Sequence, residues 1–253
     1  MKFGVCTGPE NLETAARLGF DYIECTVSGT EAMSDADYNA LLARVNASPI
    51  KIERFNVLFP ITIKLTGPEA DHGKIRAYLD RAFKRVKALG GTAVVFGSGK
   101  SRAFPADMPF RDAFGELVKV TKIIGEAASK YGIIIAIEPL NRGECNCINS
   151  VKEGAMLEAA ADHPSVQLLA DNYHMLKDNE PWDNILAVKK LRHTHISFLE
   201  GRAYPTHMND DVRLFFGALK KISYDGTMSI EGKAENFEAD CAASIKVLRS
   251  AAL

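Results

Sequence analysis

The chain has 253 residues, of which 47% are apolar and 25% charged, and its formal net charge is −1. This composition is typical of a globular protein, and the balanced charge argues against nucleic-acid or membrane-surface binding through bulk electrostatics. No apolar run in the sequence approaches the ~20 residues of a membrane span. Residues 1–6 read as a strand and not as the core of a signal peptide. The five cysteines include no CxxC pair, so we expect reduced thiols and a cytoplasmic protein.

Eight short apolar runs, several of them rich in β-branched residues, predict strands along the whole chain. Some runs are apolar throughout and do not alternate, which is typical of parallel strands with both faces covered. The predicted strands are Lys2–Cys6, Tyr22–Thr26, Ile52–Val57, Ala93–Phe96, Ile133–Ile137, Gln167–Ala170, Thr194–Ser197 and Met228–Ile230.

Stretches with apolar residues at helical spacing fill the gaps between these strands. Dividing 253 residues by eight units gives about 32 residues each, the size of a strand, a helix and two loops. We therefore expect one α/β domain over residues 1–253, folded as a (β/α)8 TIM barrel. A doubly wound sheet is the competing fold, but no Gly-rich phosphate loop follows the first predicted strand. The predicted helices are Asn11–Leu18, Asp35–Val45, Lys74–Leu89, Arg111–Tyr131, Val151–Ala161, Asp183–Leu191, Asp211–Ile222 and Glu235–Leu248.

Four successive predicted strands carry a polar residue at or near the carboxyl end, namely Glu138, Asp171, His195 and Glu231. The carboxyl ends of the strands form the active site of a TIM barrel, so we expect these side chains to meet. Three neighbouring carboxylates repel one another unless a cation lies between them. An oxygen-rich set with one imidazole suits one divalent ion, Mn²⁺ or Mg²⁺ first, with Co²⁺ or Zn²⁺ as alternatives.

Each of these residues also has a purely structural interpretation. A glutamate at a strand end is often solvated or salt-bridged, and a strand histidine is often a hydrogen-bonded core residue. His193 shares the face of His195 and competes for the same role one layer lower. Glu24 and Asn56, at the ends of the second and third predicted strands, would also face the site. The coincidence of four polar strand ends favours a metal site.

Four segments carry a family resemblance: Ile137-Glu-Pro-Leu-Asn-Arg142, Asp171-Asn-Tyr-His-Met175, His193-Thr-His195 and Ser229-Ile-Glu231. They resemble the xylose-isomerase-like barrel superfamily of sugar phosphate isomerases and epimerases, and within it the ketose 3-epimerases such as D-tagatose and D-psicose 3-epimerases. The resemblance covers nearly the whole chain in length and unit order.

The resemblance implies roles for individual residues. Glu138, Asp171, His195 and Glu231 would hold one Mn²⁺-like ion, and the two glutamates would be the catalytic acid and base. Glu144 and His174 match substrate-contacting positions. Arg202 lies near the position of a substrate-binding arginine, although its spacing from His195 is one residue longer.

The loop after the fourth predicted strand departs from the family pattern. Ser98 and its glycine neighbours leave backbone N–H groups free, and Lys100 and Arg102 add positive charge. Such a loop is either an anion or phosphate pocket, with Ser98 in contact with the substrate, or a flexible turn with two solvated cations. Lys233, two residues past Glu231, is a further candidate for binding a charged substrate group.

These residues suit the removal of a proton next to a carbonyl group. A divalent ion stabilises the cis-enediolate that results, and one glutamate would remove the proton while the other returns it. We therefore predict a metal-dependent isomerase or epimerase of a sugar or sugar phosphate, an enzyme of carbohydrate metabolism with a small carbohydrate as its partner.

Three alternatives stay open. A metal-containing TIM-barrel lyase or dehydratase, or a subunit that deglycosylates C-glycosides, would use the same ion on another substrate. An endonuclease IV-like DNA repair enzyme would need several zinc ions and more histidine ligands than the six histidines offer.

Apolar residues on the predicted outer helices favour a homo-oligomer, a dimer or tetramer, unless they belong to the core; these residues are Phe110, Phe114, Phe215 and Phe216.

Overall fold

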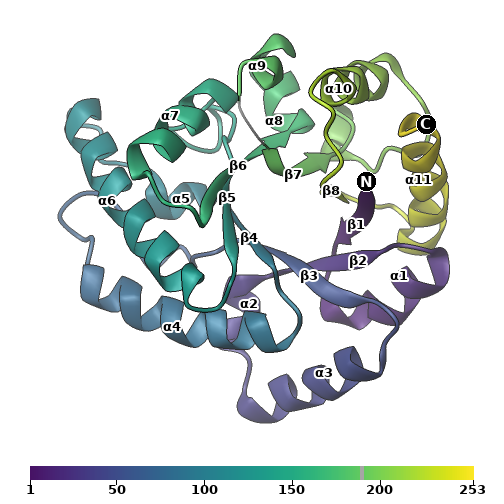
Figure 1. The fold of residues 1–253 in the computed structure, drawn as a ribbon, viewed down its shortest axis with the longest axis horizontal. Helices are drawn as coiled ribbons and strands as arrows, with labels where there is room; N and C mark the ends of the chain where they lie inside the picture. The colour runs from purple at the N-terminus through teal and green to yellow at the C-terminus, as the bar shows by residue number, and fades with distance from the viewer. Residues whose placement is uncertain (189–190) are drawn as a thin grey trace.

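Eight parallel strands close into a barrel in this computed structural model, which describes residues 1–188 and 191–253. Each strand pairs with the next along the chain, and β1 also pairs with β8, so the sheet has no edge (Figure 1). The prediction of a (β/α)8 barrel is therefore confirmed. The strands are β1 Lys2–Cys6, β2 Tyr22–Thr26, β3 Lys51–Asn56, β4 Ala93–Phe96, β5 Ile134–Ile137, β6 Val166–Asp171, β7 Leu191–Ile196 and β8 Thr227–Ile230.

Helices surround this barrel (Figure 1). Most of the longer helices begin at a side-chain cap: Ser34 Oγ, for example, accepts the Asp37 backbone N–H, and Asp71 accepts those of Gly73 and Lys74. The helices are α1 Leu12–Leu18, α2 Val27–Ala32, α3 Asp35–Ala47, α4 His72–Ala88, α5 Gly99–Arg102, α6 Phe110–Ser129, α7 Val151–Ala161, α8 Asn172–Lys177, α9 Asp183–Leu186, α10 Asp210–Lys221 and α11 Phe237–Ala251, with 3₁₀ turns η1 Pro9–Asn11 and η2 Glu200–Arg202.

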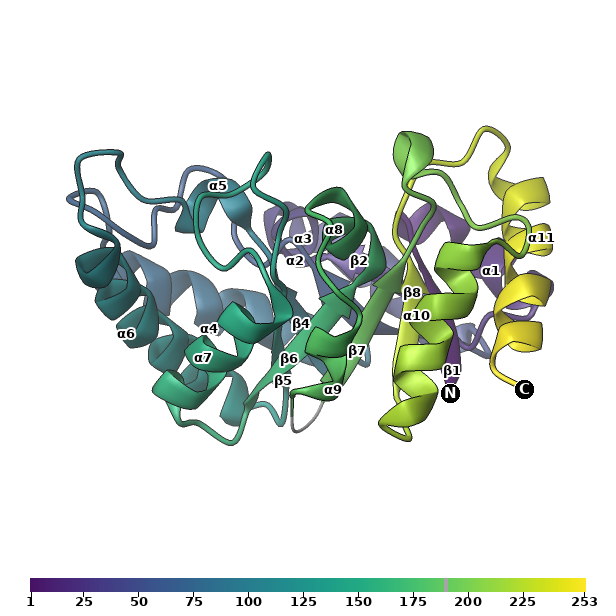
Figure 2. The same cartoon turned by 90° about the horizontal axis from the view of Figure 1, so that it is seen from above.

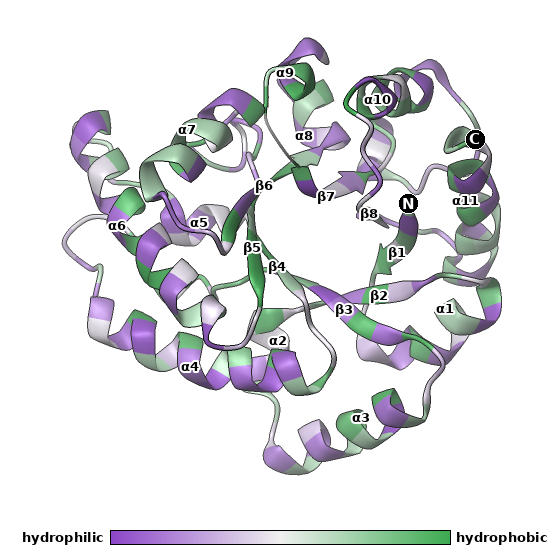
Figure 3. Cartoon of the chain, in the orientation of Figure 1, coloured by the Kyte–Doolittle hydropathy of each residue, from purple (hydrophilic) through white to green (hydrophobic). Residues whose placement is uncertain are grey.

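The apolar strands lie between the barrel interior and the helices. Every residue of β4 is buried, as the unbroken apolar run predicts for a strand covered on both faces. Figure 3 shows β4 and β5 as hydrophobic ribbons and the surrounding helices with hydrophilic stripes. The amphipathic helices α4, α6 and α10 bury their apolar residues and leave charged ones in solvent.

The strand register determines which side chains meet at the carboxyl edge. Asp171 pairs with His195 across β6 and β7, and His195 pairs with Ser229 across β7 and β8. A register shift between Ile23 and Glu24 interrupts the ladder of β2 and β3, and β-bulges of this kind redirect side chains near active sites. In Figure 2 the loops that carry α5 and α8 lie at the edge opposite the two termini.

One sequence prediction about the outer layer is wrong, and for two phenylalanines the alternative left open, a place in the core, is confirmed. The helix expected over Asp183–Leu191 ends at Leu186, because Leu191 already pairs with Leu168 as the first residue of β7; residues 189–190 of that helix lie outside the described part. Two of the four phenylalanines that favoured a homo-oligomer belong to the core: Phe215 and Phe216 are buried against the barrel.

Phe110 stays 52% exposed, so it alone of the four is largely open to solvent. Among the described residues, no helix is both long enough and apolar enough to cross a bilayer.

Candidate active site

The structure brings the four polar strand-end residues together. Glu138 directly follows β5, Asp171 ends β6, His195 lies in β7 and Glu231 directly follows β8. Each offers one ligand atom, and these four atoms all lie within 4.8 Å of one another. Asp171 and His195 are almost completely buried, whereas the Glu231 side chain is 21% exposed. The cluster therefore opens to solvent on one side only.

His195 directs one ring nitrogen at the carboxylates. Its Nδ1 lies 3.0 Å from Glu138 Oε1, 3.2 Å from Glu231 Oε2 and 3.9 Å from Asp171 Oδ2. Its Nε2 lies 3.1 Å from Glu24 Oε1 on the opposite side of the ring. A carboxylate on the second ring nitrogen is the usual partner of a metal-binding histidine, because it fixes the tautomer and the ring orientation.

Glu24 also holds the second histidine of β7. Its other oxygen lies 2.9 Å from His193 Nε2, and His193 Nδ1 lies 2.8 Å from Thr227 Oγ1. Burial alone would raise the pKa of Glu24, but the two histidines outweigh this effect and lower the pKa, so the carboxylate stays ionised. Burial lowers the pKa of His193 to about 4, so this ring is neutral. His193 thus lies one layer below the carboxylates as a hydrogen-bonded core residue.

The cluster fits one divalent ion. Ligand atoms bound at ~2.1 Å from a small cation lie about 3–4 Å apart, so the observed separations need only small adjustments of side chains. Burial and the nearby Glu231 charge raise the pKa of Glu138, which shows how costly this group of carboxylates is without a cation. Three carboxylate oxygens and one imidazole nitrogen form a ligand set that suits Mn²⁺ or Mg²⁺. Structural zinc sites, in contrast, are usually rich in cysteine sulfur.

Two neighbours hold the Glu231 carboxylate in place. Asn56 Nδ2 donates to Glu231 Oε1 over 3.1 Å, and Arg202 Nη2 pairs with Glu231 Oε2. Burial would raise the pKa of Glu231, but His195 and Arg202 outweigh it and lower the pKa to about 2. Glu138 and Glu231, which share His195 as a neighbour, therefore differ in proton affinity.

Arg202 lies across the mouth of the cluster. Besides Glu231 it faces Asp171 Oδ2 at 3.3 Å and Glu144 Oε1 at 3.8 Å, and its guanidinium lies 4.6 Å from the centre of the Tyr173 ring. The arginine is thus held by charge and by cation–π contact over the open side of the site. Arg202 is the last residue of the 3₁₀ turn η2, which carries it.

Helix α8, which the Asp171 side chain caps, carries His174. The His174 ring lies between Asn141 and Asp171. The Asn141 backbone N–H donates to His174 Nδ1 over 3.3 Å, so the ring directs Nε2 at Asp171 Oδ2, 3.5 Å away. Asn141 Nδ2 also donates to Glu144 Oε1 over 2.9 Å. Asn141 lies within a motif that the sequence analysis noted, but only the folded loop reveals that it positions both neighbours.

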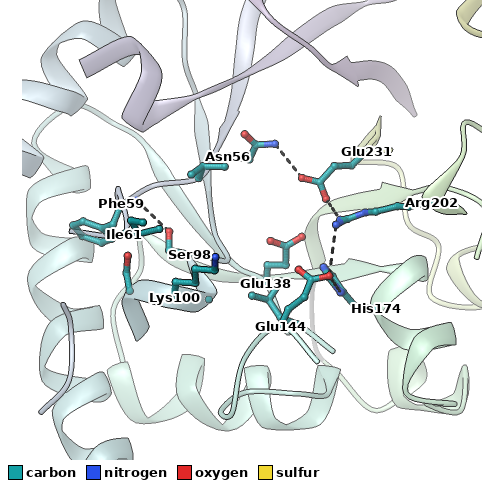
Figure 4. Close-up of a pocket in the computed structure, with 14 residues that line it drawn as sticks. Asn56, Phe59, Ile61, Ser98, Lys100, Glu138, Glu144, His174, Arg202 and Glu231 are labelled. Atoms are coloured by element: carbon teal, nitrogen blue, oxygen red, sulfur yellow. Dashed lines mark hydrogen bonds and ion pairs between the residues drawn. The ribbon is translucent and has the colours of Figure 1, made fainter. Parts of the chain in front are cut away.

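A cavity of about 250 Å³ opens above these residues. Figure 4 shows Glu138, Glu144, His174, Arg202 and Glu231 along one side of it. Phe59 and Ile61 of the loop after β3 lie on the opposite side, together with Ser98 and Lys100 (Figure 4). Sequence reasoning missed the apolar lining residues, because loop residues have no periodicity that marks a pocket. These residues are Val57, Phe59, Ile61 and Leu140.

Three residues that line the cavity have a left-handed backbone although none is glycine. Their φ angles are 45° at Val57, 41° at Ser98 and 52° at Arg202. Such conformations cost about 1–3 kcal/mol each and persist only where the surrounding structure enforces them. They are typical of functional sites.

The loop after β4 lies partly in the cavity wall. Ser98 and the exposed Lys100 line the cavity, and Ser98 Oγ accepts the Phe59 backbone N–H over 3.0 Å. The interpretation of Arg102 as a solvated cation is wrong: it is completely buried and donates to the Phe96 carbonyl oxygen over 3.0 Å. Lys233 is exposed and is not among the lining residues, since the chain leaves the barrel after Ile230.

Comparisons with known proteins agree with this architecture. The model of the xylose isomerase-like TIM barrel family matches residues 12–251. An L-ribulose 3-epimerase of Methylomonas sp. (strain DH-1) is 29% identical over 222 residues, which are 86% of this chain and 75% of that protein. A 3-dehydroshikimate dehydratase of Pseudomonas putida is 26% identical over 92% of this chain but only 37% of its own length.

A solved structure extends the likeness in fold. The D-allulose 3-epimerase of Methylomonas sp. in complex with D-allulose superposes with a TM-score of 0.85 at 22% identity, over 99% of this chain and 96% of the other. With a family model that matches almost the whole sequence, the chain belongs to the xylose isomerase-like TIM barrel family.

Proposed function

We propose that this protein is a divalent-metal-dependent ketose 3-epimerase, which inverts the carbon next to the carbonyl group of a small keto sugar. One observation carries the proposal: two glutamates that follow different strands, Glu138 and Glu231, both line the cavity and both lie within 3.2 Å of His195 Nδ1. The likeness to an L-ribulose 3-epimerase supports the same reaction class.

The ion would be held by Glu138, Asp171, His195 and Glu231, with Mn²⁺ as the first choice and Mg²⁺, Co²⁺ or Zn²⁺ as alternatives. When bound, it supplies Lewis-acid stabilisation of the negative charge that develops on the substrate oxygens. The chain itself supplies the acid and the base.

Epimerisation needs one proton-transfer group on each face of the planar intermediate. Glu138 and Glu231 come from β5 and β8, on either side of β6 and β7, and reach the cavity from different directions. The ionised carboxylate of one removes the proton at carbon 3, and the protonated carboxyl of the other returns a proton on the opposite face.

The remaining polar residues would orient the substrate. His174, held by Asn141 and Asp171, and Arg202, held by Glu231 and Tyr173, would donate hydrogen bonds to the substrate oxygens. Glu144 would accept from the distal hydroxyl groups, and Ser98 lies across the cavity from it. Lys233 would contribute only if substrate binding reordered its segment, so we give it no role.

The cavity favours a compact substrate. Its volume of about 250 Å³ is below the roughly 300–1,000 Å³ of sites for drug-sized ligands and is compatible with a monosaccharide. We therefore propose a single small carbohydrate as the partner. Phe110 is exposed, so it still supports the prediction of a homo-oligomer, which a measurement of molecular size in solution would test.

The proposal is tested by incubating the Mn²⁺-loaded protein in D₂O with a panel of ketoses, ketose phosphates and 3-dehydroshikimate. NMR should show deuterium at carbon 3 of both epimers of one ketose. Deuterium at carbon 1 of a ketose and at carbon 2 of the corresponding aldose would instead identify an isomerase. Loss of water from 3-dehydroshikimate without any exchange in the ketoses would favour a dehydratase and contradict the proposal.

A further inference from the structure

Two cysteines are in contact beside the cavity, in the loop between β5 and α7. The sulfur atoms of Cys145 and Cys147 lie 3.7 Å apart, and both residues are buried. Each thiol also contacts a backbone carbonyl: Cys145 Sγ lies 3.5 Å from the Gly99 carbonyl oxygen, and Cys147 Sγ lies 3.4 Å from that of Arg102. The sulfurs would need to approach by only about 1.7 Å to reach the ~2.05 Å of a disulfide bond.

A buried cation faces this pair. The Arg102 guanidinium is completely buried and donates to the carbonyl oxygens of Phe96 and Ile148, while its Nε has no hydrogen-bond partner among the described residues. Its two hydrogen-bond acceptors are backbone carbonyl oxygens, and no ion pair with a carboxylate is found for it within the described residues. A buried cation without a counter-charge is costly, and a thiolate beside it supplies that charge.

The hydrogen bond between the two thiols makes them differ in acidity. The hydrogen bond from Cys147 and, against the effect of burial, the Arg102 charge lower the pKa of Cys145 to about 5. The same hydrogen bond and burial raise the pKa of Cys147. One thiolate beside one protonated thiol is the arrangement of an attacking and a resolving cysteine.

We propose that Cys145 and Cys147 are a redox-active dithiol, which a hydroperoxide oxidises to an intramolecular disulfide. The Cys145 thiolate attacks the peroxide, so the O–O bond breaks and a sulfenic acid and one hydroxide or alkoxide form. The Cys147 thiol then attacks the sulfenic sulfur, the S–S bond forms, and water leaves. Two thiols lose two electrons and two protons, and the peroxide accepts both.

The position of the pair links it to the cavity. Cys145 contacts the Gly99 carbonyl oxygen and directly follows Glu144 in the chain. Gly99 and Glu144 both line the cavity, so the thiolate lies directly behind the cavity wall. The Cys145 carbonyl oxygen accepts from Asn149 Nδ2, which also donates to Leu140. Disulfide formation pulls this loop and shifts Glu144. The effect on substrate binding rests on the proposed function, whereas the oxidation itself does not.

Mass spectrometry tests the oxidation directly. Trypsin releases residues 143–152, which contain both thiols, as one peptide. After brief treatment of the full chain with one equivalent of hydrogen peroxide and alkylation of the remaining thiols, this peptide should have lost two hydrogen atoms and should regain them with a reductant. If Cys6, which is partly exposed, is oxidised while residues 143–152 remain reduced, the proposal is overturned.

Two serine variants test the order of the steps, with Cys241→Ser in α11 as the control for the loss of a buried thiol. Burial raises the pKa of Cys147, and even an ordinary thiol with a pKa near 8.5 is only about 3% ionised at pH 7, so Cys145→Ser should slow oxidation at the remaining thiol by at least about thirtyfold. Cys147→Ser should react at the wild-type rate but stop at the sulfenic acid, which dimedone traps. Equal rates in both variants would contradict the assigned roles. If the oxidised protein binds its ketose normally, only the link to Glu144 fails.

Discussion

Glu24 Oε1 lies 3.1 Å from Nε2 of His195, and this contact turns the opposite ring nitrogen towards three carboxylates. Neither residue could take this position alone, because a buried carboxylate without partners would become protonated and a free imidazole would rotate. The pair therefore connects the packed interior of the barrel with its reactive edge.

Replacement of Glu24 by glutamine should weaken metal binding without unfolding the barrel. The amide keeps the shape of the side chain but loses the charge that supports His195, and such partners typically contribute 10- to 100-fold in affinity. Calorimetric titration with Mn²⁺ measures the change. Glu13→Gln, on the surface of α1, serves as the matched control. Equal affinities in the two variants would refute the positioning role.

Glu138→Gln and Glu231→Gln should each reduce turnover by about 10²–10⁴-fold, the usual contribution of a general acid or base. The amide can still donate an oxygen to the ion, so we expect the metal content, measured by mass spectrometry, to remain similar. Each variant should lose deuterium exchange from one epimer more strongly than from the other. Equal loss from both epimers would argue against one base on each face.

Removal of divalent ions with a chelator should abolish activity and lower the melting temperature. The three carboxylates repel one another once the cation is gone, and saturation at 100 times Kd stabilises a protein by about 2.7 kcal/mol. Addition of Mn²⁺, Co²⁺ or Mg²⁺ in turn should restore both properties to different extents. Undiminished turnover after verified removal of all ions would exclude the proposed chemistry.

Gly97→Ala should reduce activity more than stability. A Cβ atom at this position would collide with Glu138 Oε2 and would also contact Leu140, so the Glu138 carboxylate would have to move out of its place in the cluster. The matched control is Gly115→Ala in α6, where a Cβ atom meets nothing within 4 Å. That control should raise the free energy of unfolding by about 0.5–1 kcal/mol. A fully active Gly97→Ala protein would show that Glu138 can move without cost.

Phe215→Ala should lower the free energy of unfolding by about 3–5 kcal/mol, because it empties a fully buried site beside Trp182. Phe110→Ala, at an exposed position, should change the stability of the monomer little. If Phe110 lies in a contact between copies of the chain, its loss should shift the oligomeric state in sedimentation. An unchanged sedimentation profile would remove this residue from the argument for a homo-oligomer.

The barrel and the four clustered residues could be predicted from sequence for one physical reason. A strand buried on both faces is apolar along its length, so the polar residue that ends it, such as Glu138 after Ile137, marks the rim. Parallel strands in one closed sheet then place all such ends at the same edge.

Other parts of the site left no comparable pattern. Helix α8 has only six residues, too few for periodicity, although it carries His174. Burial of Arg102 depends on carbonyl groups from Phe96 and Ile148, which only the folded loops bring together. The contacts of Glu24 with both histidines depend on the register shift beside it, and sequence alone does not specify a register shift.

The left-handed backbone at Val57, Ser98 and Arg202 has a consequence for how this enzyme can be improved. Glycine would relax each of these positions, yet it would remove a side chain that shapes the reaction chamber. Directed evolution for heat tolerance should therefore accumulate gains in the outer shell and leave these three positions alone. Selection for new sugars should, in contrast, change these three positions, because their backbone conformations cost energy and a differently shaped substrate could favour relaxed ones.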